Sequence, residues 1–190
     1  MGATEPVPLA AWRICNRATL LLVDSLPEAL WPLALPSAPR RSVRNLAAHL
    51  HNSRRLWMTS LARGPAGPPL PRRVEPNRAT RDQVVAALRE SGERIHQLLA
   101  IGLDNGGDFP AVASPFIYGA MPRDVALFTA YAGAHEAHHR GQIVLMARAL
   151  GHRLPPTVVN GLWQWSSRLR ESRLPASADG DPNRRTRREP

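Results

Sequence analysis

The fold is decided by MPRDVALFTAYAGAHEAHHRGQIVLMARALG, residues 121–151, which the spacing of its apolar residues predicts to be one long helix. Apolar and histidine residues recur in it at alternating steps of three and four, and such residues share one stripe of an α-helix. The stripe consists of Val125, Phe128, Ala132, His135, His139, Gln142, Met146 and Ala149. Pro122 suits the first turn, and Gly151 followed by Pro155 and Pro156 ends the helix. We expect this stripe to face a core.

Two histidines therefore fall in the middle of a predicted buried seam. Desolvation makes that position costly for an imidazole unless its nitrogens are satisfied. Because residues at i and i+4 are neighbours on a helix, His135 and His139 can hold one metal ion from the same side. His138 adds a third imidazole within the same short segment. The clustering predicts a metal site, and the ordinary alternative is a set of hydrogen-bonded histidines at the rim of the helix.

The segment HEAHH, residues 135–139, also matches the H-E-x-x-H pattern of zinc hydrolases. In that pattern two histidines bind zinc and the glutamate, here Glu136, acts as general base. Such enzymes need a third ligand further along, yet Gln142 and Leu145 stand where one extended form of the pattern has Gly and His. The acids that follow are Glu171, Asp179, Asp181 and Glu189. They lie in or beside a tail predicted to be disordered, so the hydrolase remains an alternative without an evident third ligand.

A third ligand is available upstream, in RSVRNLAAHL at residues 41–50. This segment, together with the later H-x-x-x-H-R-G-Q at 135–142, resembles the DinB/YfiT-like family of metal-binding four-helix bundles. The resemblance implies an all-α, up-down-down-up four-helix bundle with His49, His135 and His139 as metal ligands. It also implies a homodimer, because relatives are commonly dimers.

Periodicity alone does not choose between His49 and His51 as the third ligand. Each lies about a right angle from the centre of the apolar face of its helix, at ~100° per residue. The family motif selects His49. His51 is then expected to be a surface or boundary histidine.

Residues around the predicted ligands are candidates for supporting roles. Gln142 continues the stripe one turn beyond His139, and it is a candidate hydrogen-bond partner of a ligand. Glu136 and His138 lie off the stripe, so we expect them to orient ligands or to make structural bonds. Arg140 is expected to pair at the helix surface, and Gly141 is expected to permit close approach of another helix.

The rest of the chain supplies three further bundle helices. Residues 9–26 form the first, and a proline-rich connection leads to a second that Ser42 caps. The core face of the second helix reads Val43, Leu46, Leu50, Trp57 and Leu61. Residues 63–78 are Pro/Gly-rich, and at ~3.1 Å per residue they reach about 50 Å, enough to cross the whole bundle. Thr80 and Gln83 form a capping-box pattern that opens the third helix.

The remaining segments connect or follow these helices. We expect a loop over 102–120, whose Phe116-Ile117-Tyr118 cluster covers one end of the bundle. A short helix over 157–170, with Val158, Leu162, Trp163 and Trp165, should pack across the bundle as structure. From Glu171 onward there is little to bury, so a bundle domain at 1–170 should be followed by a disordered, Arg-rich tail at 171–190.

Composition restricts the class of protein further. The chain of 190 residues is long enough for one domain and contains one cysteine, Cys15, which excludes an internal disulfide framework. We expect Cys15 to be a packed thiol. The sequence contains no signal-peptide pattern and no apolar run of the ~20 residues that a membrane span needs, so we expect a soluble, cytoplasmic protein without membrane partners.

The basic residues are all arginine, and the formal net charge is +10. This charge permits non-specific attraction to polyanions. A run of arginines lies between residues 40 and 63 with no acid among them: Arg40, Arg41, Arg44, Arg54, Arg55 and Arg63. Because no helix-turn-helix, zinc finger or interleaved aromatic pattern accompanies them, we interpret them as a solvated helix face and do not expect nucleic acid as a partner.

Three histidine ligands would leave at least one metal position for water or substrate, as in catalytic sites. Imidazole ligands suit zinc first and nickel second. The family resemblance implies a thiol-dependent transferase or isomerase that acts on a small molecule with a thiol such as bacillithiol or mycothiol. Two alternatives stay open: the zinc hydrolase, and a non-enzymatic metal-binding bundle associated with stress or nucleic acid.

Overall fold

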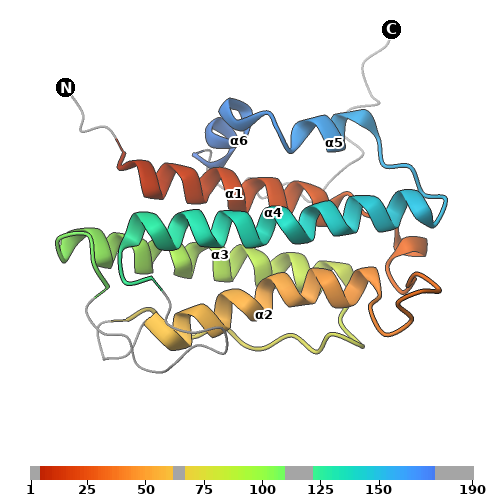
Figure 1. Ribbon diagram of the computed structural model, residues 1–190, viewed down its shortest axis with the longest axis horizontal. Helices are drawn as coiled ribbons and strands as arrows, with labels where there is room; N and C mark the ends of the chain where they lie inside the picture. Colours follow the sequence, from red (N-terminus) through yellow and green to blue (C-terminus); the bar gives the residue numbers. More distant parts are fainter. Residues whose placement is uncertain (1–4, 62–66, 110–121, 174–190) are drawn as a thin grey trace, which may run out of the picture.

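A computed structural model describes residues 5–61, 67–109 and 122–173, and throughout these ranges the regular secondary structure is helical, without strands. Four long helices form a bundle (Figure 1): α1 (Val7–Asp24), α2 (Val43–Leu61), α3 (Arg81–Asp104) and α4 (Val125–Ala149). α1 and α4 run in one direction and α2 and α3 in the other. This confirms the predicted all-α, up-down-down-up bundle.

Within the bundle, α1 and α2 each pack against both α3 and α4. Two short helices, α5 (Pro156–Gly161) and α6 (Trp165–Ser172), follow α4 and pack on α1. A single 3₁₀ turn, Glu28–Leu30, lies in the connection from α1 to α2.

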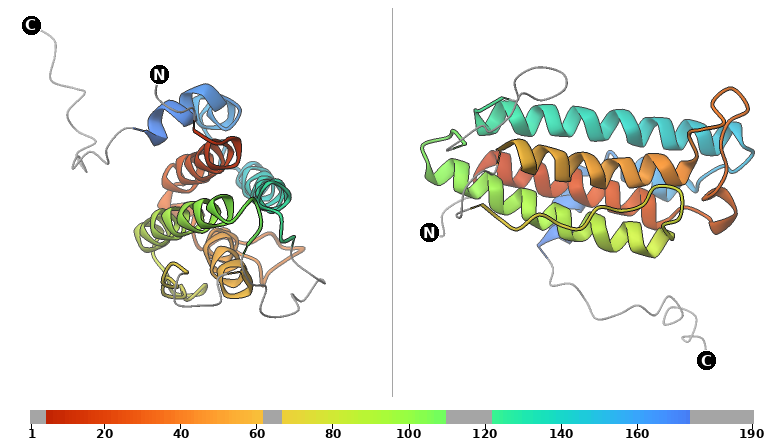
Figure 2. Two further views of the ribbon diagram at one scale, coloured as in Figure 1. Left: turned by 90° about the vertical axis from the view of Figure 1, so that its left-hand side faces the viewer. Right: turned by 90° about the horizontal axis from the view of Figure 1, so that it is seen from below.

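The described part of the connection from α2 to α3, residues 67–80, runs back along the outside of the bundle (Figure 2), so α3 starts at the end where α2 starts. Polar side chains of α2 hold it in place. One ring nitrogen of His51 lies 2.8 Å from the carbonyl oxygen of Arg72 and the other 2.9 Å from that of Ala87 in α3. Asn52 makes two hydrogen bonds with the backbone of Val74. His51 is fully buried, so its prediction as a surface or boundary histidine was wrong. The environment of His51 depends on the path of this connection, which the periodicity of the sequence does not reveal.

Local sequence signals set most of the helix ends. Ser42 Oγ accepts a hydrogen bond from Asn45 N at the start of α2, and Thr80 and Gln83 form the predicted capping box of α3. Gly151, with φ of 80°, ends α4 in a Schellman motif, in which His152 N donates to Ala147 O and Gly151 N to Arg148 O.

Some predicted boundaries were wrong. α4 begins at Val125 and not near Pro122, because the Asp124 carboxylate caps it by accepting a hydrogen bond from Leu127 N at 2.7 Å. α3 extends to Asp104, through the position where the loop was predicted to begin. The predicted cluster Phe116-Ile117-Tyr118 lies outside the described residues.

The predicted helix over 157–170 is two helices, separated by residues 162–164. α6 continues to Ser172, so Glu171 belongs to a helix and not to the tail, because its carboxylate pairs with Arg17 of α1 and with Arg168 at 2.7 and 2.6 Å. From residue 174 onward the predicted tail lies outside the described residues.

The apolar core forms two clusters, one toward each end of the bundle. One includes Leu22, Leu50, Leu88 and Ile143, and the other includes Trp12, Trp57, Ile95 and Phe128. Along each of the four helices the chain passes from one cluster into the other, and polar residues occupy the crossing point. These residues are Asn16 and Thr19 of α1, Arg54 of α2, Ser91 of α3 and Glu136 of α4.

An ion pair between Arg54 and Glu136 is the centre of this polar layer. Arg54 Nε donates to Glu136 Oε1 at 2.6 Å and Nη2 donates to Oε2 at 2.8 Å, and both side chains have 0% exposure. Arg54 Nη1 donates to Asn16 Oδ1 and to Leu88 O, both at 2.9 Å. The layer thus joins all four helices. Trp12 closes it from one side, with its ring centroid 4.9 Å from the Arg54 guanidinium carbon.

The buried pair corrects two predictions. Arg54 does not belong to a solvated arginine face, because it follows Leu50 by four residues and precedes Trp57 by three, and so occupies the core row of α2. On α4 the buried row runs through Ala132, Glu136, His139 and Ile143. His135 and Gln142, which the predicted stripe placed in the seam, lie at its partly exposed edge.

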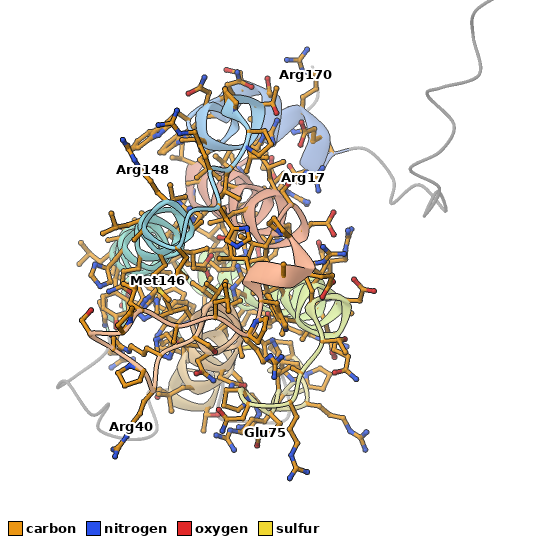
Figure 3. The ribbon with its side chains drawn as sticks, turned by 90° about the vertical axis from the view of Figure 1, so that its right-hand side faces the viewer. Arg17, Arg40, Glu75, Met146, Arg148 and Arg170 are labelled. Atoms are coloured by element: carbon orange, nitrogen blue, oxygen red, sulfur yellow. The ribbon has the colours of Figure 1, made fainter. Side chains whose placement is uncertain are left out.

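Charged side chains such as those of Arg40, Glu75 and Arg170 point away from the bundle when it is viewed along its axis (Figure 3). None of the helices in the ranges 5–61, 67–109 and 122–173 has the length and hydropathy to cross a membrane.

We predict that Arg54→Met lowers the free energy of unfolding by roughly 3–5 kcal/mol, because Glu136 would stay buried without its main counter-charge. Adding Glu136→Met should recover a large part of this loss, since two apolar side chains need no counter-charge. Urea denaturation measures both effects. Arg89→Met, at an exposed position of α3, is the matched control and should change stability by no more than about 0.5 kcal/mol. A double variant no more stable than Arg54→Met alone would contradict this account.

Candidate metal centre

His49, His135 and His139 meet between α2 and α4. Each offers a ring nitrogen, and these atoms all lie within 4.8 Å of one another. The ring centroids of His49 and His135 are each 4.5 Å from that of His139, and they are 5.4 Å from each other. His49 is exposed, His135 is half-buried and His139 is 6% exposed. The cluster therefore lies at the edge of the bundle, with one side open to solvent, and not deep in the seam.

The indole of Trp57 holds the His135 ring in place. The two rings meet edge to face at a centroid distance of 5.0 Å and an interplanar angle of 82°. Trp57 is itself buried, so the wall behind His135 is rigid. Nδ1 of His135 is buried and has no hydrogen-bond partner among the described residues. A buried nitrogen without a partner is costly, and a metal ion bound through it would remove that cost.

Gln142 connects His139 to His138. Its Oε1 lies 2.8 Å from His139 Nδ1, and its Nε2 lies 2.9 Å from His138 Nε2. The amide satisfies both contacts when His139 Nδ1–H donates to Oε1 and the amide donates to His138. Nε2 of His139 then carries the lone pair that a metal needs. On α2, Ser53 Oγ lies 3.2 Å from Nε2 of His49.

The three histidines are held in the neutral form that binds metals. Burial, together with repulsion from His139 and His49, lowers the pKa of His135 to about 4. Burial is also the main cause of the lowered pKa of His49, to which the nearby charges of His139 and Arg41 contribute. The pKa of His139 is lowered by burial as well. Three close, neutral imidazoles fit a divalent metal ion.

A family model described as the DinB family matches residues 1–173. The chain belongs to the DinB family. Comparison with curated proteins and comparison with solved structures both give no match. Family membership agrees with the helical bundle, and the three-histidine group fits a DinB-like metal-binding protein.

Glu136 does not occupy the position of a general base in this DinB bundle. Both carboxylate oxygens accept hydrogen bonds from Arg54, and Oε2 also accepts one from Thr19 Oγ1 at 2.5 Å. Burial alone would raise the pKa of Glu136, but the charge and hydrogen bonds of Arg54, together with Thr19, hold it below its ordinary value. A buried, fully paired carboxylate is a poor proton acceptor, so the geometry disfavours the zinc-hydrolase alternative.

The rest of the motif faces away from the histidines. Arg140 Nη1 donates to Thr19 Oγ1 at 2.9 Å, and the side chain is only 13% exposed, so its prediction as a surface pair was wrong. No atom from another described helix would lie within 4 Å of a Cβ added at Gly141, so none of these helices approaches it closely. Arg140 and Gly141 instead line a groove between α1 and α4.

Sequence reasoning missed two residues that shape the site, Ser53 and Trp57. Trp57 was placed in the core, which is right, but its edge-to-face contact with His135 depends on the register between α2 and α4. Ser53 follows His49 by four residues, and that spacing could have suggested the contact.

Proposed function

We propose that this DinB protein binds one zinc or nickel ion through His49, His135 and His139 and uses it in a thiol-dependent transferase or isomerase reaction on a small molecule. The observation that supports the proposal most strongly is the approach of three neutral imidazoles from two helices to within 4.8 Å, with His49 exposed. Three protein ligands with an exposed edge are typical of catalytic sites, in which a further position receives substrate.

The chain contributes geometry and electrostatics to such a reaction. Trp57 and Gln142 fix the rings of His135 and His139, so little side-chain freedom is lost on binding. When bound, a divalent ion supplies Lewis acidity, which lowers the pKa of a thiol that contacts it. The open edge beside His49 is where a small cellular thiol would enter.

The charges around the site favour an anionic partner. The histidine ligands are neutral, and Arg41 is close enough to lower the pKa of both His49 and His139. The charge of Glu136, which raises the pKa of His135, is balanced by Arg54. The exposed guanidinium of Arg41 is therefore suited to pair with a carboxylate of a thiol co-substrate.

We predict close to one divalent metal per chain after purification without chelator, and its loss in His49→Ala, His135→Ala and His139→Ala. Elemental analysis of the dialysed proteins measures this. His152→Ala removes a histidine near the end of α4 and is the matched control, which should keep the metal. Undiminished metal in the His49 variant would show that the third ligand is wrong, whereas metal loss in the control would indicate non-specific binding.

We predict that Gln142→Ala weakens metal affinity by roughly 10- to 100-fold, because His139 would lose the acceptor that fixes its ring and tautomer. Competition with a chromophoric chelator measures the affinity. His138→Ala should have a smaller effect, since the hydrogen bond of His138 is to Gln142 and not to one of the three histidines. A larger effect of His138→Ala than of Gln142→Ala would reverse the assigned roles.

The thiol part of the proposal needs a separate test. Adding bacillithiol or mycothiol to the cobalt-loaded protein should change its visible absorption, and the same thiol should be consumed with an electrophilic small molecule at a rate that depends on metal. His49→Ala should abolish both effects. A protein that holds its metal but shows neither response would keep the metal site and refute the thiol chemistry.

A further inference from the structure

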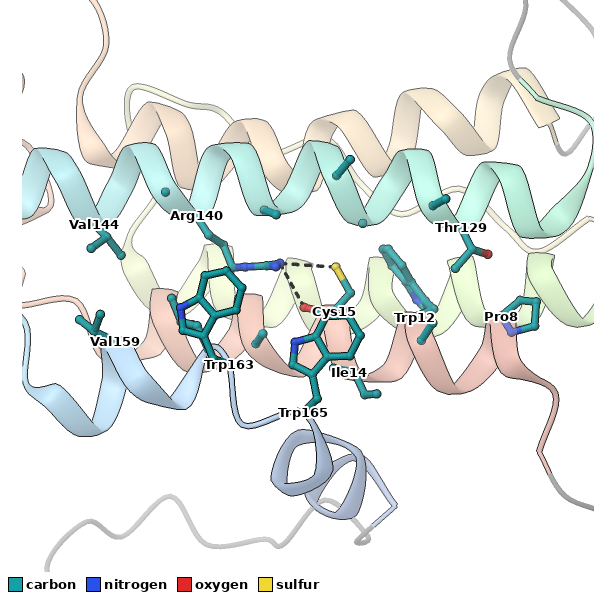
Figure 4. A pocket seen from close by; sticks show the side chains of 18 of the residues that line it. Pro8, Trp12, Ile14, Cys15, Thr129, Arg140, Val144, Val159, Trp163 and Trp165 are labelled. Atoms are coloured by element: carbon teal, nitrogen blue, oxygen red, sulfur yellow. Dashed lines mark hydrogen bonds between the residues drawn. The ribbon is translucent and has the colours of Figure 1, made fainter.

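A cavity lies on the other side of α4 from the histidines. It is a groove of about 760 Å³ between α1 and α4, bounded by the arm formed by α5 and α6 (Figure 4). None of His49, His135 and His139 lines it. Its size falls in the range of ~300–1,000 Å³ found for small-molecule sites. We call it the α1–α4 groove.

Most of the side chains that line the α1–α4 groove are apolar, and several of these side chains are exposed. Trp163 is 79% exposed and Trp165 is 58% exposed, and in Figure 4 both indoles point from the α5–α6 arm toward α4. Val7 and Leu145, at 80% and 64% exposure, line the groove as well. The prediction that the aromatic arm packs across the bundle as structure was therefore wrong for these two tryptophans. Large apolar side chains gathered around one cavity are typical of a binding site.

The floor of the groove is kept open by small residues of α4. Gly133 and Gly141 lie two turns apart with Ala137 between them, and all three line the groove. A Cβ added at either glycine would meet no atom of the described chain within 4 Å. Glycine in the middle of a helix costs about 1 kcal/mol relative to alanine, and packing within the described chain does not require it here.

The charge inside the groove is positive. Among the described residues that line it, the charged ones are Arg140 and Arg148, without an acid. Arg140 reaches from α4 toward Cys15 (Figure 4), and within the described part of the chain its hydrogen bonds all come from Nη1. Nε and Nη2 therefore remain to donate to a ligand.

The excess positive charge at Arg140 is not compensated by the surrounding residues. Among the described ion pairs, the only carboxylate near Arg140 is that of Glu136, 3.9 Å away, and Arg54 already binds both of its oxygens. Cys15 adds no negative charge, because burial raises the pKa of its thiol. Two guanidinium groups thus share one carboxylate next to an apolar cavity, where a second anion would be favoured.

We propose that the α1–α4 groove binds a single-chain amphipathic anion, a long-chain carboxylate. The carboxylate pairs with Nε and Nη2 of Arg140 between Trp163 and Trp165. The acyl chain runs along α4 toward Val7 and Ala126, because the described residues that line the groove in that direction are uncharged. α4 rises about 21 Å between Arg140 and Ala126 at ~1.5 Å per residue, which accommodates an extended acyl chain.

Binding of dodecanoate to the full-length, delipidated protein tests the proposal, with dodecanol as the uncharged match. Calorimetry below the micellar concentration should give saturable binding of one dodecanoate per chain, at least tenfold tighter than dodecanol. Gly141→Leu fills the groove and should weaken both ligands at least tenfold. Ala149→Leu adds the same side chain at an exposed position of α4 outside the groove and should change neither affinity.

Arg140→Met separates the head group from the chain. It should remove the preference for dodecanoate and leave dodecanol binding intact, which also shows that the variant is folded. Equal affinities of the parent protein for the two ligands would overturn the anionic head group. Absent dodecanoate binding would overturn the proposal as a whole. A dimer that Gly141→Leu dissociates would also overturn it, because a second copy would then occupy the groove. Binding to anionic phosphatidylglycerol vesicles without binding of free dodecanoate would overturn it as well.

Discussion

The ion pair of Arg54 and Glu136 fixes the register of the bundle, and the geometry of the histidines depends on it. A buried charge is tolerated only when its partners are all in place, so a shift of α2 against α4 would leave both charges unpaired. Because the two helices are antiparallel, the residues before Arg54 lie level with those after Glu136. His49 precedes Arg54 by about 1.4 turns, and His139 follows Glu136 by about 0.8 of a turn. The pairing that buries the charges therefore brings the imidazoles together.

The polar layer also separates the two apolar clusters, and it keeps the helices from sliding along one another. Rows of leucine and valine pack almost equally well after a shift of one helical turn. A buried guanidinium, in contrast, finds its hydrogen-bond partners at only one position along the bundle. Gly92 supports this arrangement from α3. Its carbonyl accepts a hydrogen bond from Trp12 Nε1 at 2.8 Å, and a side chain in its place would collide with Asn16, which in turn accepts from Arg54. Small, aromatic and charged residues thus act together to define one alignment of the four helices.

The parts of the fold that sequence could predict depend on local rules. Thr80 with Gln83 and Gly151 after α4 mark helix ends because the chemistry of a cap lies within a few residues. The histidine spacing on α4 follows from one helical turn, and the pairing with His49 came from a family motif. Arg54 was missed because a search for apolar spacing passes over a charged residue. The spacing from Leu50 to Trp57 nevertheless leaves one core position between them, which Arg54 fills. The burial of His51 depends on the path of the connection to α3, which no local pattern encodes.

The two faces of α4 differ in how they treat positive charge. Toward α2, His135 and His139 are neutral and half-buried or buried, so a cation can enter without displacing another. Toward α1, Arg140 is a permanent cation that, among the described residues, makes its hydrogen bonds through Nη1 alone. Glu136, whose side chain lies between these faces, balances Arg54 and leaves Arg140 in excess. One helix thus carries neutral imidazoles on one face and an excess guanidinium on the other, and the residue between them is the same carboxylate that pairs with Arg54.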